Sequence, residues 1–210
     1  MSRERLVEEL STHIADRRVL AAVADVPRDL FVPRSMRRDA WENTSLPIGH
    51  GQTISQPTVV ARMCELLELH GDEHVLDVGT GSGYHAAVLA KLAAHVVSIE
   101  RHAALSRTAA EALAAAGIGN VELVVGDGSR GHPESAPYDA INVAAGSRHG
   151  VPAALVEQLA DGGRLVLPLD GGHQRLTLVR REGDRYRQKQ HDAVRFVPLV
   201  TGKHADRGDP

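Results

Sequence analysis

The sequence of 210 residues has little cysteine and few aromatic residues, and both scarcities narrow the possible classes of protein. Its one cysteine, Cys64, excludes a disulfide within the chain and favours a reducing, cytoplasmic location. Aromatic residues make up only 3%, so a core drawn from 42% hydrophobic residues must be mainly aliphatic. This composition predicts one folded domain of ordinary size rather than a disordered chain.

The chain also lacks a concentration of charge of one sign. It has 24 Lys and Arg against 27 Asp and Glu, a formal net charge of −3, without a dense basic cluster, so we expect no nucleic-acid partner. No stretch approaches the roughly 20 apolar residues of a membrane span, so we expect no membrane partner. His70 and His74 are four residues apart, but they lie in an expected turn, so we expect no metal site.

Apolar strands alternate with helices through the middle of the sequence. The expected strands are 75–78, 95–100, 121–125, 138–143 and 164–167, and the expected helices between them are 84–92, 103–116 and 151–159. This alternation predicts an α/β fold with a doubly wound, mostly parallel sheet. Helical periodicity marks residues 4–25, a helix should open at Pro57, and segments 174–181 and 186–197 predict a closing antiparallel strand pair. Residues 40–56 show little periodicity and are expected to form an irregular binding loop.

A glycine-rich loop follows the first expected strand of the sheet and precedes a helix. It reads Gly79-Thr80-Gly81-Ser82-Gly83, and glycines at such a turn let the backbone approach a ligand without a Cβ in the way. The dinucleotide fingerprint G-x-G-x-x-G would place a glycine at position 84, where this chain has Tyr84. The loop therefore predicts a nucleoside-bearing cofactor and disfavours an NAD oxidoreductase.

Two carboxylates are expected at the ends of the next two strands. Glu100 lies 100 − 81 = 19 residues after the middle glycine, where a carboxylate can accept both ribose hydroxyls. Asp127 and Gly128 follow the third strand, where the carboxylate can accept from the amine of adenine. Each feature has a structural alternative, because the loop can be a tight turn, Glu100 a helix-start acid and Asp127 a turn former. Their position at successive strand ends favours cofactor binding.

The segment before the sheet indicates a family. It reads Gly49-His50-Gly51-Gln52-Thr53-Ile54-Ser55-Gln56-Pro57, and together with the glycine loop it resembles the protein-L-isoaspartate O-methyltransferases. The resemblance runs over nearly the whole chain and includes Val26-Pro27-Arg28, Gly126-Asp127-Gly128 and Arg195-Phe196-Val197-Pro198-Leu199. It implies a Rossmann-like class I methyltransferase fold and the cofactor S-adenosyl-L-methionine (AdoMet).

The activity that this resemblance implies is methylation of the α-carboxylate of L-isoaspartyl residues in damaged proteins and peptides. The ester would close to a succinimide, whose hydrolysis returns some normal aspartyl linkage, so we expect a protein-repair enzyme that acts as a cytoplasmic monomer. Two alternatives stay open: a specialised relative that methylates an aspartyl residue of a biosynthetic peptide, and a non-catalytic nucleoside-binding module.

The resemblance also assigns roles to residues. Ser55 is the implied catalytic residue, whose hydroxyl would orient an acceptor carboxylate that is already ionised at pH 7 and needs no general base. The alternative is that Ser55 only caps the helix opened by Pro57. The peptide would be bound by Ser55, Val197, Pro198 and Leu199. The expected cofactor-binding residues are Gln52, Thr53, Ile54, Ser55, Gly79, Thr80, Gly81, Ser82, Gly83, Glu100, Asp127 and Gly128.

We expect a single methyltransferase domain over residues 1–201. Residues 1–56 would supply N-terminal helices and the active-site segment, 57–170 the AdoMet-binding core, and 171–201 the C-terminal strands. Residues 202–210 are polar and are expected to form a disordered tail. The 12 histidines are interpreted as surface residues, and Cys64 as an inert core residue on the apolar face of its helix.

Overall fold

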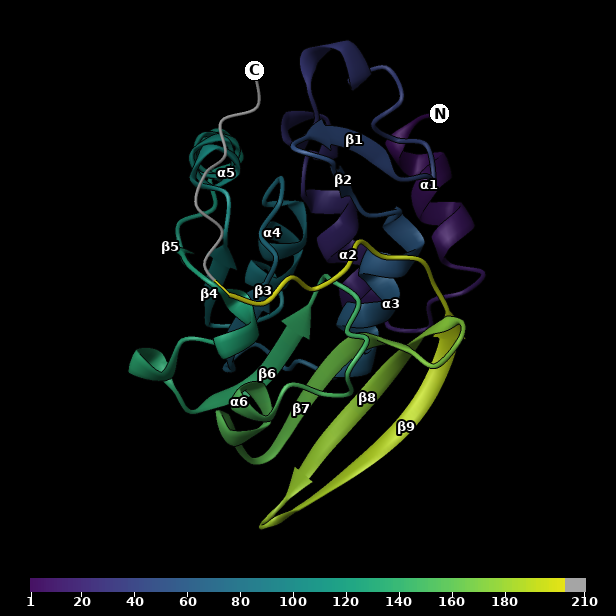
Figure 1. Ribbon diagram of the computed structural model, residues 1–210. Coiled ribbons are helices and arrows are strands. Elements are labelled where there is room, and N and C mark those ends of the chain that lie inside the picture. The colour runs from purple at the N-terminus through teal and green to yellow at the C-terminus, as the bar shows by residue number, and fades with distance from the viewer. Residues whose placement is uncertain (203–210) are drawn as a thin grey trace.

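The protein is described by a computed structural model over residues 1–202 (Figure 1). The predicted tail, apart from Gly202, lies outside the described residues. The helices are α1 (Arg3–Leu10), α2 (Arg17–Asp25), α3 (Pro57–Leu67), α4 (Tyr84–Ala90), α5 (Ala103–Ala115) and α6 (Ala153–Glu157). The strands are β1 (Leu46–Gly49), β2 (Gln52–Ile54), β3 (His74–Val78), β4 (His95–Glu100), β5 (Val121–Val125), β6 (Tyr138–Val143), β7 (Leu159–Asp170), β8 (Gln174–Glu182) and β9 (Arg185–Ala193).

Seven strands form one sheet in the order β5-β4-β3-β6-β7-β8-β9. The pairs from β5 to β7 are parallel, and β8 is antiparallel to both β7 and β9. The predicted fold class, a mostly parallel doubly wound sheet with an N-terminal helical region and a C-terminal antiparallel strand pair, is therefore confirmed. The strand order reverses between β3 and β6, and in such sheets ligands bind beyond the carboxyl ends of the strands at that point.

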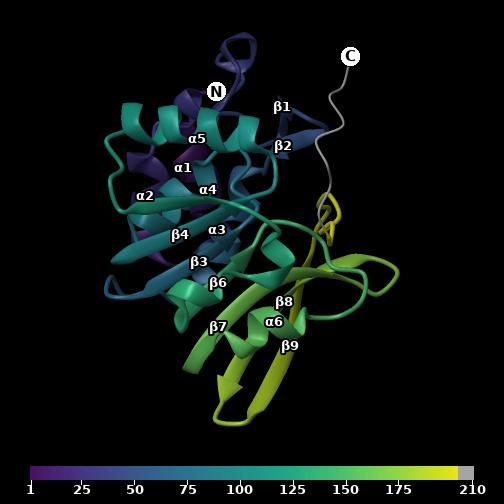
Figure 2. The same cartoon turned by 60° about the vertical axis from the view of Figure 1, so that its left-hand side comes forward.

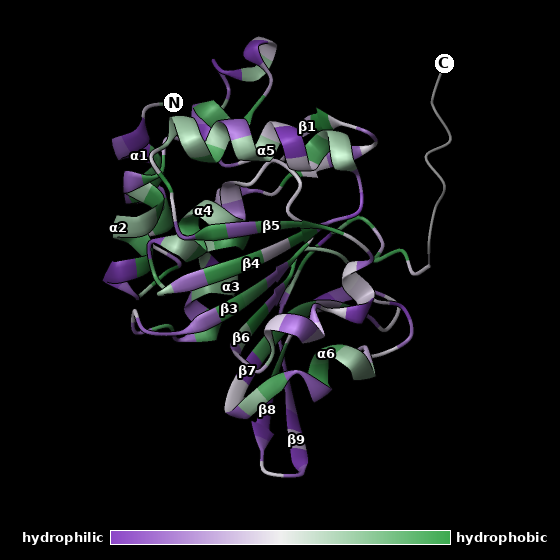
Figure 3. Cartoon of the chain, turned by 90° about the vertical axis from the view of Figure 1, so that its left-hand side faces the viewer, coloured by the Kyte–Doolittle hydropathy of each residue, from purple (hydrophilic) through white to green (hydrophobic). Residues whose placement is uncertain are grey.

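Successive residues of the central strands point to opposite faces of the sheet and pack in two cores, one on each face. Val75 and Val96 pack in the core that α1, α2, α3 and α4 cover, whereas their neighbours Leu76 and Val97 pack on the opposite face with Leu155 of α6. Figure 2 shows the two layers of helices on either side of the sheet, and Figure 3 shows the apolar central strands against the hydrophilic outer strand β9. Within residues 1–202, none of the helices has the length and apolarity that crossing a bilayer would need.

Two N-terminal segments differ from the sequence prediction. The helical region at 4–25 is divided into α1 and α2, because the side chain of Asp16 caps α2 by accepting from the amide of Arg18 at 2.8 Å. The segment at 40–56 is not wholly irregular, since β1 and β2 pair antiparallel. Three consecutive residues with positive φ (Gly49, His50 and Gly51) turn the chain between these short strands.

The C-terminal boundaries also differ from those predicted. The expected strand 164–167 extends over Leu159–Asp170, because both ends of β7 find backbone partners, Tyr138 of β6 and Gln174 of β8. The expected strand 186–197 ends at Ala193, and residues 194–202 leave the sheet edge to run across the carboxyl ends of the central strands (Figure 1). This departure brings Gly202, the end of the described chain, next to Arg101 and Asp127, which follow β4 and β5.

Candidate active site

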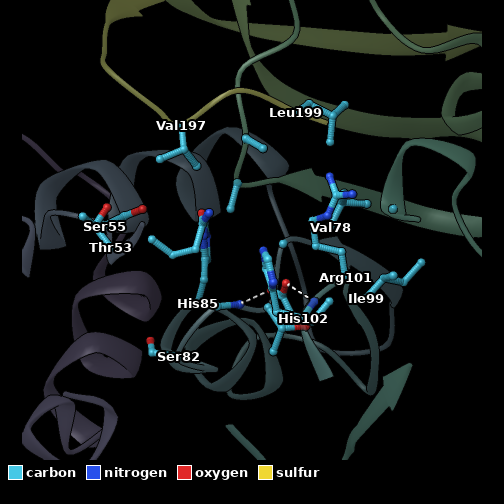
Figure 4. Close-up of a pocket in the computed structure, with 18 of the residues that line it drawn as sticks. Thr53, Ser55, Val78, Ser82, His85, Ile99, Arg101, His102, Val197 and Leu199 are labelled. Carbon is cyan, nitrogen blue, oxygen red and sulfur yellow. Dashed lines mark hydrogen bonds between the residues drawn. The ribbon is translucent and has the colours of Figure 1, made fainter. Parts of the chain in front are cut away.

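A cavity of about 350 Å³ opens beyond the carboxyl ends of β3 and β4. The glycine loop forms its floor, and its walls come from β2 with the start of α3, from the residues that follow β4, and from the chain after β9. Thr53 and Ser55 lie at one end of this cofactor cavity, and Ile99 and Arg101 lie at the other (Figure 4). Its volume and its place beyond the strand ends suit a ligand that contains a nucleoside.

The glycine loop has a backbone that other residues adopt only under strain. Gly79, Gly81 and Gly83 have φ of 96°, 53° and 87°. A Cβ on Gly81 would lie 3.4 Å from Cδ1 of Ile48, so the hairpin β1–β2 lies directly against the loop. A Cβ on Gly83 would lie 3.1 Å from Cβ of Ala109, so this third glycine lets α4 approach α5 and does not line the cavity.

Glu100 connects the loop to the next strand. Its side chain is 5% exposed; Oε2 accepts from the amide of Gly81 at 2.9 Å, and Oε1 accepts from the amide of His102 at 2.9 Å. Each carboxylate oxygen retains acceptor capacity beyond these bonds. Glu100 therefore fixes the loop while presenting a negative charge to the cavity.

A buried polar layer lies beneath the loop. Ser98 donates from Oγ to Oδ2 of Asp77 at 2.7 Å, the hydroxyls of Ser98 and Thr80 lie 2.6 Å apart, and Asn142 donates from Nδ2 to Oδ1 of Asp77 at 2.7 Å. Burial is the largest influence on Asp77 and raises its pKa, although both hydrogen bonds oppose the shift. These contacts tie the ends of β3, β4 and β6 together under Thr80.

His85 completes this layer and lines the cofactor cavity. Its Nδ1 lies 3.2 Å from Nδ2 of Asn142, and its Nε2 lies 3.6 Å from Sγ of Cys64. Because Asn142 directs its amide hydrogens at Asp77 and His85, Nδ1 is the acceptor and Nε2 carries the proton. Burial lowers the pKa of His85 to about 3, so its imidazole is neutral at pH 7.

The interpretation of all histidines as surface residues was wrong for His85, which is 6% exposed. The interpretation of Cys64 as an inert core residue is confirmed, because its side chain is buried and burial is the main cause of its raised pKa.

Ser55 lies where the cofactor cavity meets a second, outer cavity of about 420 Å³. Thr53, Ser55, Ala144 and Val197 line both. Ser55 does not cap α3, whose N-cap is Gln56 without a side-chain bond.

Asn43, rather than Ser55, accepts hydrogen bonds from the first turn of α3. Its Oδ1 accepts from the amide of Thr58 at 3.1 Å and from the hydroxyl of the same residue at 2.9 Å. Within residues 1–202, no hydrogen bond occupies the hydroxyl of Ser55. That hydroxyl is therefore free to meet a ligand at the junction of the two cavities.

Asp127 is placed differently from the other predicted residues. Its Oδ1 accepts from the amide and hydroxyl of Ser129 at 3.1 and 2.7 Å, and its Oδ2 accepts from the amide of Gly202 at 2.8 Å. Burial favours a raised pKa, but these hydrogen bonds outweigh it and hold the pKa of Asp127 below its usual value. Gly128 lines the cofactor cavity, whereas Asp127 does not.

Residues 197–202, here called the C-terminal strap, cross the cofactor cavity. The amide of Gly146 donates to the carbonyl of Val197 at 2.8 Å, and the amide of Leu199 donates to the carbonyl of Gly146 at 2.8 Å. Arg101 holds the far part of the strap by donating to the carbonyl oxygens of Val200 at 3.2 Å and Gly202 at 3.4 Å. The strap is thus attached both to the segment after β6 and to the segment after β4.

Most of the predicted site residues lie together around the cofactor cavity. All of the predicted cofactor-binding and substrate-binding residues line it except Gly83 and Asp127, and Pro198 and Leu199 face this cavity rather than the outer one. Sequence reasoning missed several lining residues, which are Val60, Val78, Tyr84, His85, Ile99, Arg101, His102, Ala144, Ala145 and Val200. Across residues 1–202 there is no group of three or more His, Cys, Asp or Glu side chains that could hold a metal ion.

Known proteins resemble this chain over nearly its whole length. The sequence profile of the family described as "Protein-L-isoaspartate(D-aspartate) O-methyltransferase (PCMT)" matches residues 1–204. A protein-L-isoaspartate O-methyltransferase of Halorhodospira halophila is 55% identical, with 96% of this chain and 93% of that one covered. The enzyme of the same name from Methanoregula boonei is 54% identical, with 91% and 88% covered.

Solved structures of proteins with the same name also resemble this chain. A protein-L-isoaspartate O-methyltransferase superposes with a TM-score of 0.86 at 29% identity, covering 95% of this chain and 66% of that one. A putative protein-L-isoaspartate O-methyltransferase from Plasmodium falciparum, in complex with S-adenosyl-L-homocysteine, superposes with a TM-score of 0.81 at 25% identity, covering 95% and 99%.

Proposed function

The chain belongs to the protein-L-isoaspartate O-methyltransferase family, and we propose that its two cavities meet at Ser55 so that a cofactor and an isoaspartyl carboxylate come together there. Its activity is AdoMet-dependent methylation of L-isoaspartyl residues in proteins and peptides, which leads to their repair. The observation that carries the proposal is the free hydroxyl of Ser55 on the wall shared by both cavities.

The residues of the cofactor cavity suit AdoMet. Gly79 and Gly81 line the cavity without a side chain and have a positive φ that other residues adopt only under strain, and Glu100 offers acceptor sites for the ribose hydroxyls. Gln52, Thr53 and Ile54 line the wall near Ser55, while Gly128 lines the opposite region. Asp127 would reach an adenine amine only by adjusting its contacts with Gly202, and we keep that role as a proposal.

The residues of the cofactor cavity, among them Gly79, Gly81 and Glu100, would hold AdoMet, which would supply an electrophilic methyl group to a carboxylate oxygen while its sulfur kept the electron pair of the C–S bond. The acceptor carboxylate, with a usual pKa of about 4, is ionised at pH 7, so no residue needs to remove a proton. What this chain contributes is alignment and the exclusion of water.

Ser55 is the residue proposed to align the acceptor. Its hydroxyl would donate one hydrogen bond to one carboxylate oxygen and leave lone pairs on the other free to attack. Val197 lies on the shared wall on the strap side, and Ile54, which precedes Ser55, is buried. Neither neighbour competes for the hydroxyl, so its orientation can follow the substrate.

We further propose that residues 1–201 act as one catalytic domain and as a cytoplasmic monomer. The single sheet continues from β5 to β9, and the N-terminal helices pack in the same core as the central strands. The large hydrophobic side chains exposed among residues 1–202 (Val125, Tyr186 and Val200) are scattered rather than gathered on one helix or strand. A buried single thiol suits a reducing compartment.

The test is a methyl-transfer assay with two peptides that differ only in having an L-isoaspartyl or a normal aspartyl linkage. Transfer from AdoMet to the isoaspartyl peptide, with little transfer to its aspartyl twin, is the expected result. The product should be base-labile, as a carboxyl methyl ester is, and should decay through a succinimide. Preferential methylation of the aspartyl peptide would overturn the repair function and favour a dedicated peptide substrate.

A further inference from the structure

The outer cavity presents one charged side chain along the path to Ser55. Of the described residues that line it, only Arg195 is charged; the others are Ser45, Thr53, Ser55, Gln56, Val59, Ala144, Ala193, Val194, Phe196 and Val197. The cofactor cavity is not lined by Arg195. The cation of Arg195 therefore lies on the cavity proposed for the peptide and not on the one proposed for AdoMet. This inference rests on the function proposed above.

The guanidinium of Arg195 is exposed and available to a ligand. Two arginines of the C-terminal strands are paired with carboxylates: Arg180 lies 2.6 Å from Glu68, and Arg187 lies 2.9 Å from Glu182. Within residues 1–202, Arg195 has neither a salt bridge nor a side-chain hydrogen bond. Its positive charge is therefore not neutralised by the protein itself.

The reacting carboxylate is not the group that Arg195 suits best. That carboxylate must lie at the wall shared by both cavities, where Ser55 and Val197 are found, and Arg195 is absent from this wall. A bidentate guanidinium would also occupy the lone pairs needed for attack on the methyl group. Arg195 precedes Val197 by two residues, so their Cα atoms lie at most about 7 Å apart. This separation corresponds to about one or two residues of a bound peptide, whose Cα atoms are spaced by about 3.8 Å.

We propose that Arg195 is a specificity-determining residue that selects isoaspartyl segments with an acidic residue beside the isoaspartyl position. A neighbouring Asp or Glu carboxylate can pair with the free guanidinium, whereas a neighbouring Lys or Arg is repelled by it. Because Arg195 is exposed, its interaction with a peptide charge is screened by solvent and is modest in size. The preferred substrates are thus aged segments of acidic character.

The experiment measures kcat/KM for peptides that share an isoaspartyl centre and carry Glu, Ala or Lys at one neighbouring position. One set varies the residue before the isoaspartyl residue, and the other varies the residue after it. For the natural chain, kcat/KM for the Glu peptide should exceed that for the Lys peptide by about threefold to tenfold in at least one set. Arg195→Gln should bring this ratio close to one, Arg195→Glu should invert it, and Arg195→Lys should restore most of it.

Arg185→Gln is the matched control, because this substitution removes the same charge. Arg185 is exposed at the start of β9 and lines neither cavity. It should leave the Glu-to-Lys ratio unchanged. The proposal is overturned if the natural chain shows no preference in either set, or if its preference survives Arg195→Gln. Methylation of the Ala peptides reports the proposed function separately: their failure to react would contradict the function itself, whereas a flat ratio among reacting peptides contradicts only the role of Arg195.

Discussion

The cofactor cavity and the outer cavity share a wall at Ser55, yet they differ in how their residues are held. The cofactor cavity lies at the ends of regular strands, where Glu100 and the buried layer around Asp77 fix the backbone through short hydrogen bonds. The outer cavity lies between residues 45–59 and 193–197, and its charged group, Arg195, is exposed and unpaired within residues 1–202. In the function that we propose, the fold thus provides a fixed site for one invariant cofactor and an open site for varied peptides.

The strongest test of this difference removes the carboxylate of Glu100. Glu100→Ala should raise the AdoMet dissociation constant on the order of 100-fold, because the two charge-assisted hydrogen bonds that we propose to the ribose would be lost along with the support of Gly81. Turnover at saturating AdoMet should change little, since Glu100 does not line the outer cavity. Calorimetric binding and steady-state kinetics measure the two effects.

Glu100→Gln is the companion variant, because it keeps the shape and one acceptor oxygen but removes the charge. It should fall between the natural chain and Glu100→Ala in AdoMet affinity. A thermal melt verifies that both variants are folded. If turnover at saturating AdoMet falls while the dissociation constant stays the same, the ribose assignment is wrong.

Ser55→Ala probes the junction itself. The variant should lower kcat/KM for an isoaspartyl peptide by about 10-fold to 100-fold, the value of one hydrogen bond to a charged group, while the AdoMet dissociation constant changes by less than about twofold. Ser45→Ala serves as the comparison, because Ser45 lines only the outer cavity and should show a smaller loss. An equal loss of AdoMet affinity in Ser55→Ala would show that Ser55 supports the local structure rather than the acceptor.

His85, in the buried layer beneath the cofactor cavity, should lower stability in acid, whereas the raised pKa of Asp77 in the same layer acts in the opposite sense. Burial lowers the pKa of His85 to about 3 in the folded chain, whereas a histidine in an unfolded chain has a pKa of about 6.5. As the pH falls, the unfolded chain therefore binds a proton first, and the folded state is destabilised relative to it. From pH 7.5 to pH 5 this difference should cost about 2 kcal/mol of unfolding free energy. The lowered carboxylate pKa values of Glu73 and Asp127 act at more acidic pH, below their usual values.

The measurement compares urea unfolding at pH 7.5 and pH 5 for the natural chain and for His85→Gln. The variant should lose less stability between the two pH values. His149→Gln, which replaces an exposed histidine, should behave as the natural chain does. An identical pH dependence in His85→Gln and the natural chain would show that other groups govern the acid limit.

The same division between the cavities explains what the sequence could predict. The glycine loop and Glu100 follow the order of strands along the chain, so their meeting at one edge of the sheet could be predicted from spacing. His85 could not, because it lies in a helix where every residue is buried, and its contact with Cys64 depends on how α3 packs against α4. Arg195 was included in the family resemblance, but its position on the outer cavity depends on the early end of β9 at Ala193.

Short elements and close contacts between elements were the other features that the sequence could not reveal. The hairpin β1–β2 has strands of four and three residues, and Pro47 within β1 weakens any strand pattern. Gly83 was assigned to the cofactor with its two neighbouring glycines, but its lack of a side chain serves the approach of Ala109 from α5. Both features depend on contacts between elements, which spacing along one chain does not encode.

A substitution that loosens the C-terminal strap should have the smallest effect of those considered. The strap borders both cavities, so this test decides which of the two cavities it serves. Val197 lines both, while Leu199 and Val200 line only the cofactor cavity, where Arg101 ties the strap down. Arg101→Met keeps an aliphatic wall but loses two exposed hydrogen bonds, so AdoMet affinity should fall by about twofold to fivefold while KM for the peptide stays constant. Arg107→Met on the exposed side of α5 is the matched control and should leave both values unchanged. If instead the KM for the peptide rises and AdoMet affinity holds, the strap belongs to the substrate side, and the boundary between the fixed and the open site lies at Arg101 rather than at Ser55.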